Sequence, residues 1–375
     1  MAEPIRILHV LGNLNKGGAE SRIMDIYRAI DRSRVQFDFM VHTDKPGFFD
    51  SEIKSLGGRI YHEVPRFRII NFVQYRRAWL RFFATHPYNC IHIHTYNTAL
   101  PILMAAKRAG ILGRICHSHS SSSTGIARKL MVRVSRKHIR KLATHRFAVS
   151  NLAGQHVFGH DFQVKPNAFD VLLFRYDEDK RSAMRQELGL QDSFLLGAVA
   201  RFHEVKNHTF MLDVLAELKK TVPNAHLLLV GDGPLQTKIE TRAANLGLAE
   251  SVTFLGLRND IPALLAAMDV FLMPSFHEGF PGAALEAQAS GLLTLLSSAI
   301  TPEVGVVPDI TVYLSINDGV YPWVDKILCY VKKPLTRRGT TEEIIAAGYG
   351  IRDVVRWYEG FYVGISPESY DTMYN

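Results

Sequence analysis

The chain alternates short runs of β-branched and other apolar residues with amphipathic stretches of helical length, and the alternation continues through both halves. This pattern constrains the fold strongly, because parallel strands need crossover connections, which are usually helices. Helices are expected at stretches such as Phe210–Leu218 and Leu235–Leu246. We therefore predict an α/β chain with two Rossmann-like domains. The expected strands are Ile5–Val10, Val35–Val41, Arg59–Glu63, Cys90–His94, Arg114–His117, Arg146–Val149, Leu195–Ala200, His226–Val230, Val252–Phe254, Val270–Met273 and Leu293–Leu295.

The length of 375 residues also favours two domains over one. Between the two sets of strands lies Pro166–Lys180, which carries a proline and then the acidic cluster Asp177–Asp179. Such a stretch is typical of a linker, and we place the boundary there. The expected division is residues 1–170, residues 171–350, and a helical segment at 351–375 that packs back on the first domain.

The net charge of +8 hides a strong asymmetry. Residues 1–170 contain 26 Lys and Arg against 11 Asp and Glu, whereas residues 171–375 contain 18 against 25. Between Pro101 and Ser150 there are eleven basic residues and no acidic one. A field of this sign attracts anionic partners such as phosphorylated substrates, nucleic acid or an anionic membrane.

Residues 126–146 are expected to form a helix with a basic face. Lys129, Arg133, Arg136 and Arg140 recur at steps of four, three and four, so they share one side of the helix. This side could lie on anionic lipid, or it could be the solvated face of a packed helix. Both interpretations stay open. Because this stretch contains no acidic residue, the membrane interpretation is as well supported as the solvated face.

The sequence has no apolar run of about 18 residues that could span a membrane, and no signal-peptide pattern precedes its first strand-like segment. The three cysteines, Cys90, Cys116 and Cys329, are too few and scattered for a disulfide framework or a thiolate zinc site. We expect a cytoplasmic protein, either free or peripheral on the inner face of the cell membrane.

Ligands of doubly wound sheets bind beyond the carboxyl ends of the strands, near helix N-termini, and this rule selects three segments. After the first strand, Gly17 and Gly18 would let backbone N–H groups approach a phosphate, although such a loop alone is more often a flexible turn. After Leu195–Ala200, Arg201 and Lys206 offer two cations suited to a leaving diphosphate, although isolated loop cations are usually only solvated.

The third segment, Pro274–Ala287, is the most informative. A loop carboxylate, Glu278, precedes a helix whose first N–H groups, at Gly282 and Ala283, can hold a diphosphate. Glu286 follows eight residues later, so two acids could bracket one sugar nucleotide. On spacing alone, the alternative is that Glu278 caps the helix and Glu286 is a surface charge.

Together these segments resemble the retaining glycosyltransferases of family four, and among them the bacterial capsular and exopolysaccharide enzymes. The resemblance implies their glycosyltransferase-B fold, which has two facing Rossmann-like domains. The resemblance covers almost the whole chain. Its most specific element is the pair of acids from Glu278 to Glu286 within this setting. The other matching elements are Gly17–Glu20, Pro166–Asp170, Arg201 with Lys206, Val230–Pro234, Phe254–Gly256 and Asp260–Pro262.

The resemblance implies roles for these residues. Arg201 and Lys206 would bind the donor diphosphate, and Glu278 would bind the transferred sugar. Residues 1–170 would bind a lipid-linked or polysaccharide acceptor, with contacts expected from His94 and Asn97. The expected donor contacts are Gly17, Gly18, Gly256, Arg258, Gly279, Phe280, Pro281, Gly282, Ala283 and Glu286, with Glu286 at the ribose and Gly256–Arg258 at the base.

Several histidines are candidates for a contact with the sugar. His119 ends the run Cys116–His119 and matches the active-site histidine of the family. His117 and His119 share one strand face, as do His92 and His94, so His94 is a second candidate and a role in the core is a third. A zinc site would need all four histidines to converge, and we do not expect one.

The implied reaction moves a hexose or N-acetylhexosamine from a nucleotide sugar, expected to be a UDP-sugar, with retention. No cofactor and no metal are expected, because the cations and the helix start can hold the diphosphate. The chain departs from the family pattern at three positions. Ala168 and Asn207 stand where the family commonly has glycine, and Gly282 replaces a bulky aliphatic residue, which loosens one wall of the donor pocket and leaves the donor sugar open. Alternatives are a sugar-nucleotide epimerase, a phosphorylase or a non-catalytic sugar-nucleotide-binding protein. Nucleic-acid binding is not expected, since no recognition motif accompanies the basic charge.

Overall fold

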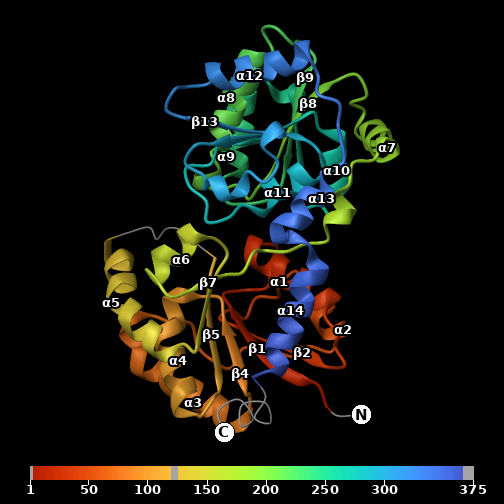
Figure 1. The fold of residues 1–375 in the computed structure, drawn as a ribbon. Coiled ribbons are helices and arrows are strands. Elements are labelled where there is room, and N and C mark those ends of the chain that lie inside the picture. The colour runs from red at the N-terminus through yellow and green to blue at the C-terminus, as the bar shows by residue number, and fades with distance from the viewer. Residues whose placement is uncertain (1–2, 120–125, 366–375) are drawn as a thin grey trace. The chain divides into compact units, whose positions relative to one another are not determined.

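The computed structural model describes residues 3–119 and 126–365, with the backbone alone for residues 126–132. The chain divides into two compact units (Figure 1). Unit 1 comprises the residues up to Phe169 and the segment from Gly348 onward, and unit 2 comprises Asp170–Ala347. The chain therefore passes from one unit to the other twice.

Unit 1 is built on a seven-stranded parallel sheet with the order β3-β2-β1-β4-β5-β6-β7. The order reverses between β1 and β4. From β1 the chain first adds β2 and β3 on one side, and it then crosses back to add β4 to β7 on the other side. Loops that leave two such strands diverge, which creates a crevice at their carboxyl ends. The strands are β1 (Ile5–Leu11), β2 (Val35–Val41), β3 (Ile60–Tyr61), β4 (Cys90–Ile93), β5 (Gly113–Ser118), β6 (His145–Ala148) and β7 (Gln163–Val164).

Helices cover both faces of this sheet, so alternate residues of each strand enter two different cores. Ile7 and Leu11 of β1 lie in the core under α1 and α14, whereas Leu8 and Val10 lie in the core under α3 and α4. The helices of unit 1 are α1 (Gly18–Ala29), α2 (Asp50–Ser55), α3 (Phe72–Thr85), α4 (Tyr96–Arg108), α5 (Ile126–Leu142), α6 (Asn151–Val157) and α14 (Ile351–Val363).

The C-terminal helix α14 completes the first of these cores. Val355, Tyr358 and Tyr362 recur at steps of three and four, are buried, and pack on the sheet beside α1. The return of the chain is anchored at Phe169, whose N–H donates to Tyr349 O at 3.1 Å and whose carbonyl accepts from Ile351 N–H at 3.1 Å.

Unit 2 has a six-stranded parallel sheet with the order β10-β9-β8-β11-β12-β13, which reverses between β8 and β11. Its strands are β8 (Phe194–Val199), β9 (Ala225–Val230), β10 (Val252–Gly256), β11 (Val270–Met273), β12 (Leu293–Ser297) and β13 (Thr311–Leu314). Its helices are α7 (Glu178–Leu188), α8 (His208–Leu218), α9 (Gln236–Asn245), α10 (Ile261–Ala267), α11 (Gly282–Ala289), α12 (Tyr321–Lys332) and α13 (Thr341–Ile344).

These two sheets confirm the predicted fold class, and every strand expected from the sequence is present. Two strands were not expected, β7 and β13. Both are short edge strands, and both residues of β7 are exposed, so neither has the buried apolar run that marks the other strands. Within the described residues, no helix combines the length and the apolar character needed to cross a membrane.

Two local expectations were wrong. The helix expected at 126–146 ends at Leu142, because Thr144 N–H already donates to Arg114 O at 2.9 Å and the chain then joins the sheet as β6. The acidic cluster Asp177–Asp179 is not linker. Asp177 is the N-cap of α7, and its carboxylate accepts from the N–H groups of Asp179 and Lys180 at 3.0 and 3.1 Å.

Candidate active site

The loops after β8 and β11 lie next to each other in unit 2, because these strands are neighbours at the point where the sheet order reverses. Backbone contacts join the two loops. Phe276 N–H donates to Val205 O at 2.9 Å, and the Asn207 side-chain amide donates to Pro274 O at 3.2 Å. The loops that carry Lys206 and Glu278 are thus held together, where open parallel sheets bind their ligands.

Lys206 and Glu278 form an ion pair in this crevice. The ammonium group donates to one carboxylate oxygen, and the two side chains are only 23% and 13% exposed. The residues are 72 positions apart in the sequence, so the fold brings them together. A cation and an anion kept in contact at a ligand-binding edge can separate to meet the opposite charges of a bound molecule.

Helix α11 begins directly after the Glu278 loop. Pro281 is its N-cap residue and makes no side-chain cap, so the N–H groups of Gly282 and Ala283 meet no capping side chain. Glu286, one turn further on, is 8% exposed, which excludes the interpretation that it is a surface charge. Gln288 fixes the helix, because its amide donates to Val304 O at 2.8 Å and accepts from Val307 N–H at 3.0 Å.

Asn207 explains one departure from the family pattern. Its backbone has φ 54° and ψ 46°, in the left-handed region that glycine enters most easily and that asparagine tolerates best among the other residues. The asparagine therefore keeps the conformation that a glycine would adopt after Lys206. Its side chain adds the bond to Pro274, which glycine could not make.

Arg201 lies exposed at the start of the β8 loop, and glycines crowd the backbone beside it. Gly231 and Gly233 have φ of 138° and 152°, and a Cβ atom on them would lie 2.2 Å from Ala200 O and 2.5 Å from Phe202 O. Phe202 N–H donates to Asp232 O at 2.7 Å. These glycines are explained by close backbone packing, which holds the Arg201 loop in place.

The Gly256–Arg258 loop, predicted at the base, follows β10. Arg258 Nε donates to Asp260 at 2.8 Å, and Arg258 Nη2 donates to Glu187 at 2.9 Å. These carboxylates hold the guanidinium, so Arg258 shapes the loop. Gly256 has φ 63°, and its carbonyl accepts from Gly231 N–H at 2.8 Å. A contact of this loop with a base stays a prediction.

In unit 1 the predicted glycines begin α1. Gly17 is the N-cap residue, makes no side-chain cap, and accepts from Ser21 N–H at 2.9 Å. A Cβ atom at Gly17 would lie 2.3 Å from a Glu20 carboxylate oxygen, whereas one at Gly18 would meet nothing within 4 Å. The start of α1 thus presents N–H groups at the carboxyl end of β1, as a phosphate site requires.

Five histidines converge on the α14 side of the sheet in unit 1. His9 comes from β1, His92 and His94 from β4 and its end, and His117 and His119 from β5 and its end. His9 is directly opposite His92 in the strand register. Four of the five were expected to share faces in pairs. His9 was missed, because its only signal is the register of β1 against β4, which the sequence does not reveal.

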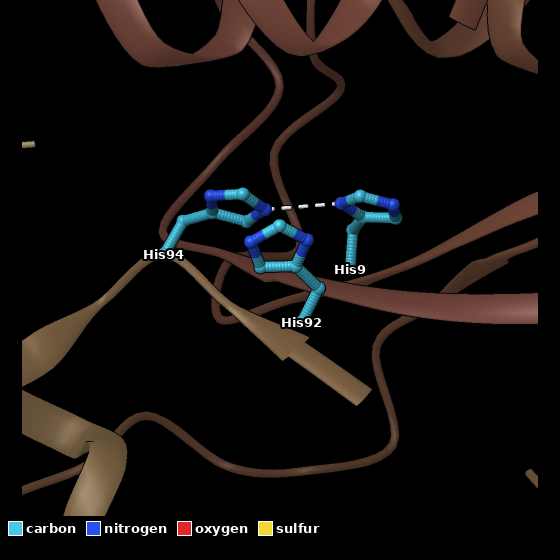
Figure 2. Close-up of side chains that lie close together, drawn as sticks. All are labelled: His9, His92 and His94. Atoms are coloured by element: carbon cyan, nitrogen blue, oxygen red, sulfur yellow. Dashed lines mark hydrogen bonds between the residues drawn. The ribbon is translucent and has the colours of Figure 1, made fainter. Parts of the chain in front are cut away.

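Hydrogen bonds connect these rings into two chains. His9 Nδ1 lies 3.0 Å from His94 Nε2, and His94 Nδ1 lies 2.9 Å from His119 Nε2. The dashed line in Figure 2 marks the first of these hydrogen bonds. In the second chain, His92 Nδ1 lies 2.8 Å from the Tyr362 hydroxyl and His92 Nε2 lies 3.2 Å from His117 Nδ1. Both nitrogens of His94 are therefore occupied, which favours His119 over His94 as the ligand contact.

Burial keeps these rings neutral. It lowers the pKa of His9 to about 3 and that of His119 to about 4. It also moves the pKa of His92, His94 and His117 well below the ordinary histidine value. Neutral imidazoles can bind metal ions, and the ligand nitrogens of two triplets lie within 4.8 Å of one another. These triplets are His9, His92, His94 and His94, His117, His119.

A small cavity of about 20 Å³ adjoins the histidines. Arg22 lines it, and among the described side chains around it there is no carboxylate that would compensate a bound cation. Histidine ligands of metals usually donate their second N–H to a carboxylate, a carbonyl or water, whereas these rings mostly bond to each other. The cluster can hold a metal by distance, but its surroundings favour a neutral network.

The remaining predicted residues lie on α4 and α5. Asn97 is in the first turn of α4, and its side-chain oxygen is buried with no partner among the described residues. On α5, Arg133 is exposed, whereas Arg136 donates to His156 O at 2.6 Å and Arg140 lies 3.6 Å from Asp161. The Lys129 side chain lies outside the described residues. Two of the four basic residues therefore bind neighbouring parts of unit 1.

Family models match both halves of the chain. Residues 17–172 match the model described as glycosyl transferase 4-like domain, and residues 180–338 match glycosyl transferases group 1. Over 334 residues the chain is 37% identical to the putative glycosyltransferase EpsF of Bacillus subtilis. The alignment covers 86% of this chain and 86% of EpsF. It is 25% identical to the capsular polysaccharide biosynthesis glycosyltransferase CapH of Staphylococcus aureus, over 78% of this chain and 81% of CapH.

Two further proteins are informative. One is the UDP-Gal:alpha-D-GlcNAc-diphosphoundecaprenol alpha-1,3-galactosyltransferase of Escherichia coli, which is 28% identical over 56% of this chain and 58% of its own. The other is the crystal structure of HepE from Anabaena in complex with UDP. Its TM-score is 0.78 at 22% identity, over 96% of this chain and 99% of HepE, which shows a shared fold.

Proposed function

The chain belongs to the family-four glycosyltransferases with the glycosyltransferase-B fold, and from this premise we propose that it transfers a hexose or N-acetylhexosamine from a nucleotide sugar to a growing cell-surface glycan, with retention. CapH and the Escherichia coli relative support a role in capsule or exopolysaccharide synthesis. The observation that carries the proposal is the Lys206–Glu278 pair at the reversal point of the unit 2 sheet.

The chemistry requires stabilisation of two opposite charges. When the bond between the anomeric carbon and the diphosphate breaks, positive charge develops on the sugar and negative charge on the diphosphate. Arg201, Lys206 and the N–H groups at the start of α11 supply fixed positive charge for the diphosphate. As the diphosphate attracts Lys206, the Glu278 carboxylate becomes available to orient and stabilise the sugar.

Retention follows if the acceptor attacks from the face that the diphosphate leaves. The acceptor oxygen then forms the new bond to the anomeric carbon, and a departing phosphate oxygen takes the acceptor proton. This route needs no protein base and no metal ion. It agrees with neutral histidines in unit 1, because a neutral ring can bind sugar hydroxyls without taking part in proton transfer.

A UDP-sugar is the proposed donor. HepE binds UDP on the same fold, and the Escherichia coli relative uses UDP-galactose. A panel of UDP-, GDP- and ADP-sugars tested by thermal shift would identify the nucleotide, because a ligand stabilises the fold more as its concentration exceeds its Kd. A larger shift with a GDP- or ADP-sugar would overturn the UDP assignment.

The test of the reaction is the Glu278→Gln variant. Its turnover should fall at least about 100-fold, because the carboxylate is lost while the side-chain shape is kept. Glu204→Gln is the matched control, since Glu204 is an exposed acid beside Lys206, and its activity should stay near that of the unmodified protein. Full activity of Glu278→Gln would contradict the proposal.

A lipid-linked acceptor is the proposed second substrate, by analogy with the diphosphoundecaprenol acceptor of the Escherichia coli relative. Such an acceptor would require unit 1 to meet the inner face of the cell membrane. The basic face of α5 is one candidate surface. The internal bonds of Arg136 and Arg140 reduce what this face can offer to lipid.

A second surface of unit 1 fits anionic lipid better. Ile69 and Ile70, in a 3-10 turn just before α3, and Val73, in the first turn of α3, are 68%, 90% and 56% exposed beside a groove of about 730 Å³. Four arginines around them are exposed: Arg66, Arg68, Arg77 and Arg81. Exposed isoleucines can enter the interface of a bilayer, and each nearby basic residue adds about 1 kcal/mol on anionic lipid.

Sedimentation with vesicles separates the two surfaces. Anionic vesicles should retain the protein at low salt, and Ile69→Ser with Ile70→Ser should weaken binding roughly 10- to 100-fold through lost apolar burial. Leu172→Ser with Leu173→Ser is the control, because these leucines of unit 2 are 53% and 57% exposed. Weaker binding only when Lys129, Arg133, Arg136 and Arg140 are reversed in charge would assign the contact to α5.

A further inference from the structure

We infer that Glu20 is a sugar-binding residue of unit 1. Its carboxylate lies over the start of α1 and accepts hydrogen bonds from hydroxyl groups of the acceptor sugar, so this helix start takes an uncharged sugar and not the donor diphosphate. That the sugar is the acceptor rests on the proposed function. The binding of a sugar at Glu20 does not, because it can be measured without any transfer.

The position of Glu20 follows from the order of residues at the start of α1. Gly17 is the N-cap residue, Gly18 begins the helix, and Glu20 is its third residue. A glutamate at the third position can reach back to the N-cap, because the first turn of a helix carries unpaired N–H groups and a partial positive charge. A Cβ atom on Gly17 would lie 2.3 Å from one Glu20 carboxylate oxygen and 3.2 Å from the carboxyl carbon. The Glu20 side chain therefore folds back over Gly17.

This contact explains the glycine at position 17. Gly17 has φ −138° and ψ 166°, an extended conformation that any residue adopts, so its backbone does not require glycine. The three atoms nearest to a Cβ at this position all belong to Glu20. The Glu20 carboxylate therefore fills the space that glycine leaves beside the first N–H groups of α1.

The helix starts of the two units differ in charge. At α11 the first turn contains no acid, and the carboxylate of the preceding loop, Glu278, is paired with Lys206. At α1 the first turn contains Glu20, and the ammonium of Lys16 lies 4.4 Å from the centroid of the Phe48 ring. A carboxylate repels a phosphate, whereas it has about four acceptor positions for hydroxyl groups. The charges thus favour the diphosphate at α11 and an uncharged sugar at α1.

A second acceptor atom lies at the same crevice. β1 and β4 are neighbours at the reversal point of the sheet, and α1 and α4 begin after them. Asn97 is in the first turn of α4, and its side-chain oxygen is buried with no hydrogen-bond partner among residues 3–119 and 126–365. A buried polar atom needs a partner, and a sugar hydroxyl is a donor that suits this oxygen. Both helix starts therefore present oxygen acceptors to one ligand site.

An aromatic ring lies beside the start of α1. Phe48 is 44% exposed, whereas its neighbour Phe49 is 3% exposed. Phe48 N–H donates to the Asn15 side chain at 3.2 Å, and Phe49 N–H donates to Leu14 O at 3.0 Å, so the loop after β2 is held against the loop that leads into α1. Ligand sites commonly combine aromatic surface with a few polar groups, and the apolar face of a sugar ring can stack on Phe48. The ring and the oxygen acceptors together suit a pyranose.

The experiment is saturation-transfer NMR with the methyl α-glycosides of glucose, galactose and N-acetylglucosamine, in the presence of excess UDP to fill the donor site. At least one glycoside should bind the unmodified protein. Glu20→Ala should weaken its binding about 10-fold, because a hydrogen bond to a charged group is lost. Phe48→Ala should also weaken it, whereas Phe48→Tyr should keep it because the ring remains.

Asp353→Ala is the matched control. Asp353 is also the third residue of a helix that follows a glycine N-cap in unit 1, and its side chain is 70% exposed. Its loss affects the first turn of α14 as the loss of Glu20 affects that of α1. Glycoside binding should stay unchanged in this variant, because α14 begins away from the crevice between β1 and β4.

Gly17→Ala tests the geometry. Its Cβ should displace the Glu20 carboxylate, which is the far end of a flexible side chain, and so weaken glycoside binding as Glu20→Ala does. The double variant should be no weaker than Glu20→Ala, because both substitutions act on the same contact. The Kd for UDP, measured by calorimetry, should stay unchanged in all three variants.

Three results would overturn the inference: unchanged glycoside binding in Glu20→Ala, no binding of any of the glycosides, or weaker UDP binding in Gly17→Ala. The last result would assign this helix start to the diphosphate. Glycoside binding that depends on Glu20, in a protein that neither binds UDP nor transfers a sugar, would leave the sugar site correct and refute the proposed function instead.

Discussion

The two units organise their candidate site residues in opposite ways. Unit 2 holds charged side chains in loops at the end of its sheet, where Lys206 and Glu278 pair. Unit 1 holds neutral rings on the strands themselves, where His9, His92 and His94 bond to one another or to their neighbours. Yet unit 1 is the basic one, with 28 Lys and Arg against 14 Asp and Glu, and unit 2 has 16 against 22. The net charge of a unit thus says little about the electrostatics of its site.

The largest expected effect tests the charged site residues of unit 2. Arg201→Ala combined with Lys206→Ala should lower turnover roughly 10,000-fold, because each preorganised donor to a developing negative charge is worth about 100- to 1,000-fold. The melting temperature should change little, since Arg201 is exposed and Lys206 lies in a loop.

Lys332→Ala is the control for lost positive charge in unit 2, because Lys332 is exposed in the last turn of α12 and belongs to neither loop. Turnover in the double variant close to that of Lys332→Ala would show that the diphosphate is held by other groups. The loop that carries Arg201 and Lys206 would then not be the diphosphate site.

The next largest effect tests the neutral histidines of unit 1. Below pH 6.5 the histidines of the unfolded chain take up protons, whereas His9 and His119 stay neutral down to about pH 3 and 4. The stability that their neutral state provides is present above pH 6.5 and is lost as the pH falls. These two residues alone should lower the free energy of unfolding by roughly 4 kcal/mol between pH 7 and 5.

Denaturant unfolding at the two pH values measures this loss. Equal stability at pH 7 and pH 5 would mean that the buried rings become protonated in the folded state, and the contrast between the units would disappear.

A smaller effect concerns the backbone that supports the charged loops. Asn207→Gly should change the free energy of unfolding by less than about 1 kcal/mol, because glycine enters the left-handed region easily. Asn207→Val should cost about 1–3 kcal/mol, since a β-branched residue is strained there. Thermal unfolding of the two variants decides this, and equal melting temperatures would show that the loop does not require the conformation.

The smallest expected effect is no effect at all. Turnover should survive dialysis against EDTA, because fixed cations and N–H groups are proposed to hold the diphosphate. A loss of activity that Mg²⁺ or Mn²⁺ restores would place a metal at the charged site. A loss of stability that Zn²⁺ restores would instead place one among the histidines, and the two readouts separate these outcomes.

The sequence predicted most of the fold, because buried parallel strands appear in a sequence as short, mainly apolar runs. Val35–Val41 and Val270–Met273 were predicted with their observed boundaries, since Val270–Met273 is a continuous apolar run and Val35–Val41 is apolar at every position except Gln36 and Asp38. Edge strands such as Thr311–Leu314 have a weaker apolar pattern, because no strand covers their outer side and their residues are less buried.

The candidate site was predictable only where its residues are close in the sequence. The Glu278 and Glu286 spacing and the cations after Leu195–Ala200 lie within short segments, so their motifs stand out. The pairing of Lys206 with Glu278 depends on the order of strands, and the place of His9 depends on register. Both are set by the packing of whole sheets, which no short motif records.

The course of the chain through the two units has a consequence for biosynthesis. Domains usually fold in the order in which they leave the ribosome. Here unit 2 is complete once Ala347 has been synthesised, whereas the sheet of unit 1 waits for α14 to cover its apolar face. His92 likewise waits for Tyr362, 270 residues further along the chain. The unit that begins first therefore finishes last, and throughout the synthesis of unit 2 the nascent chain must keep an uncovered sheet from aggregating.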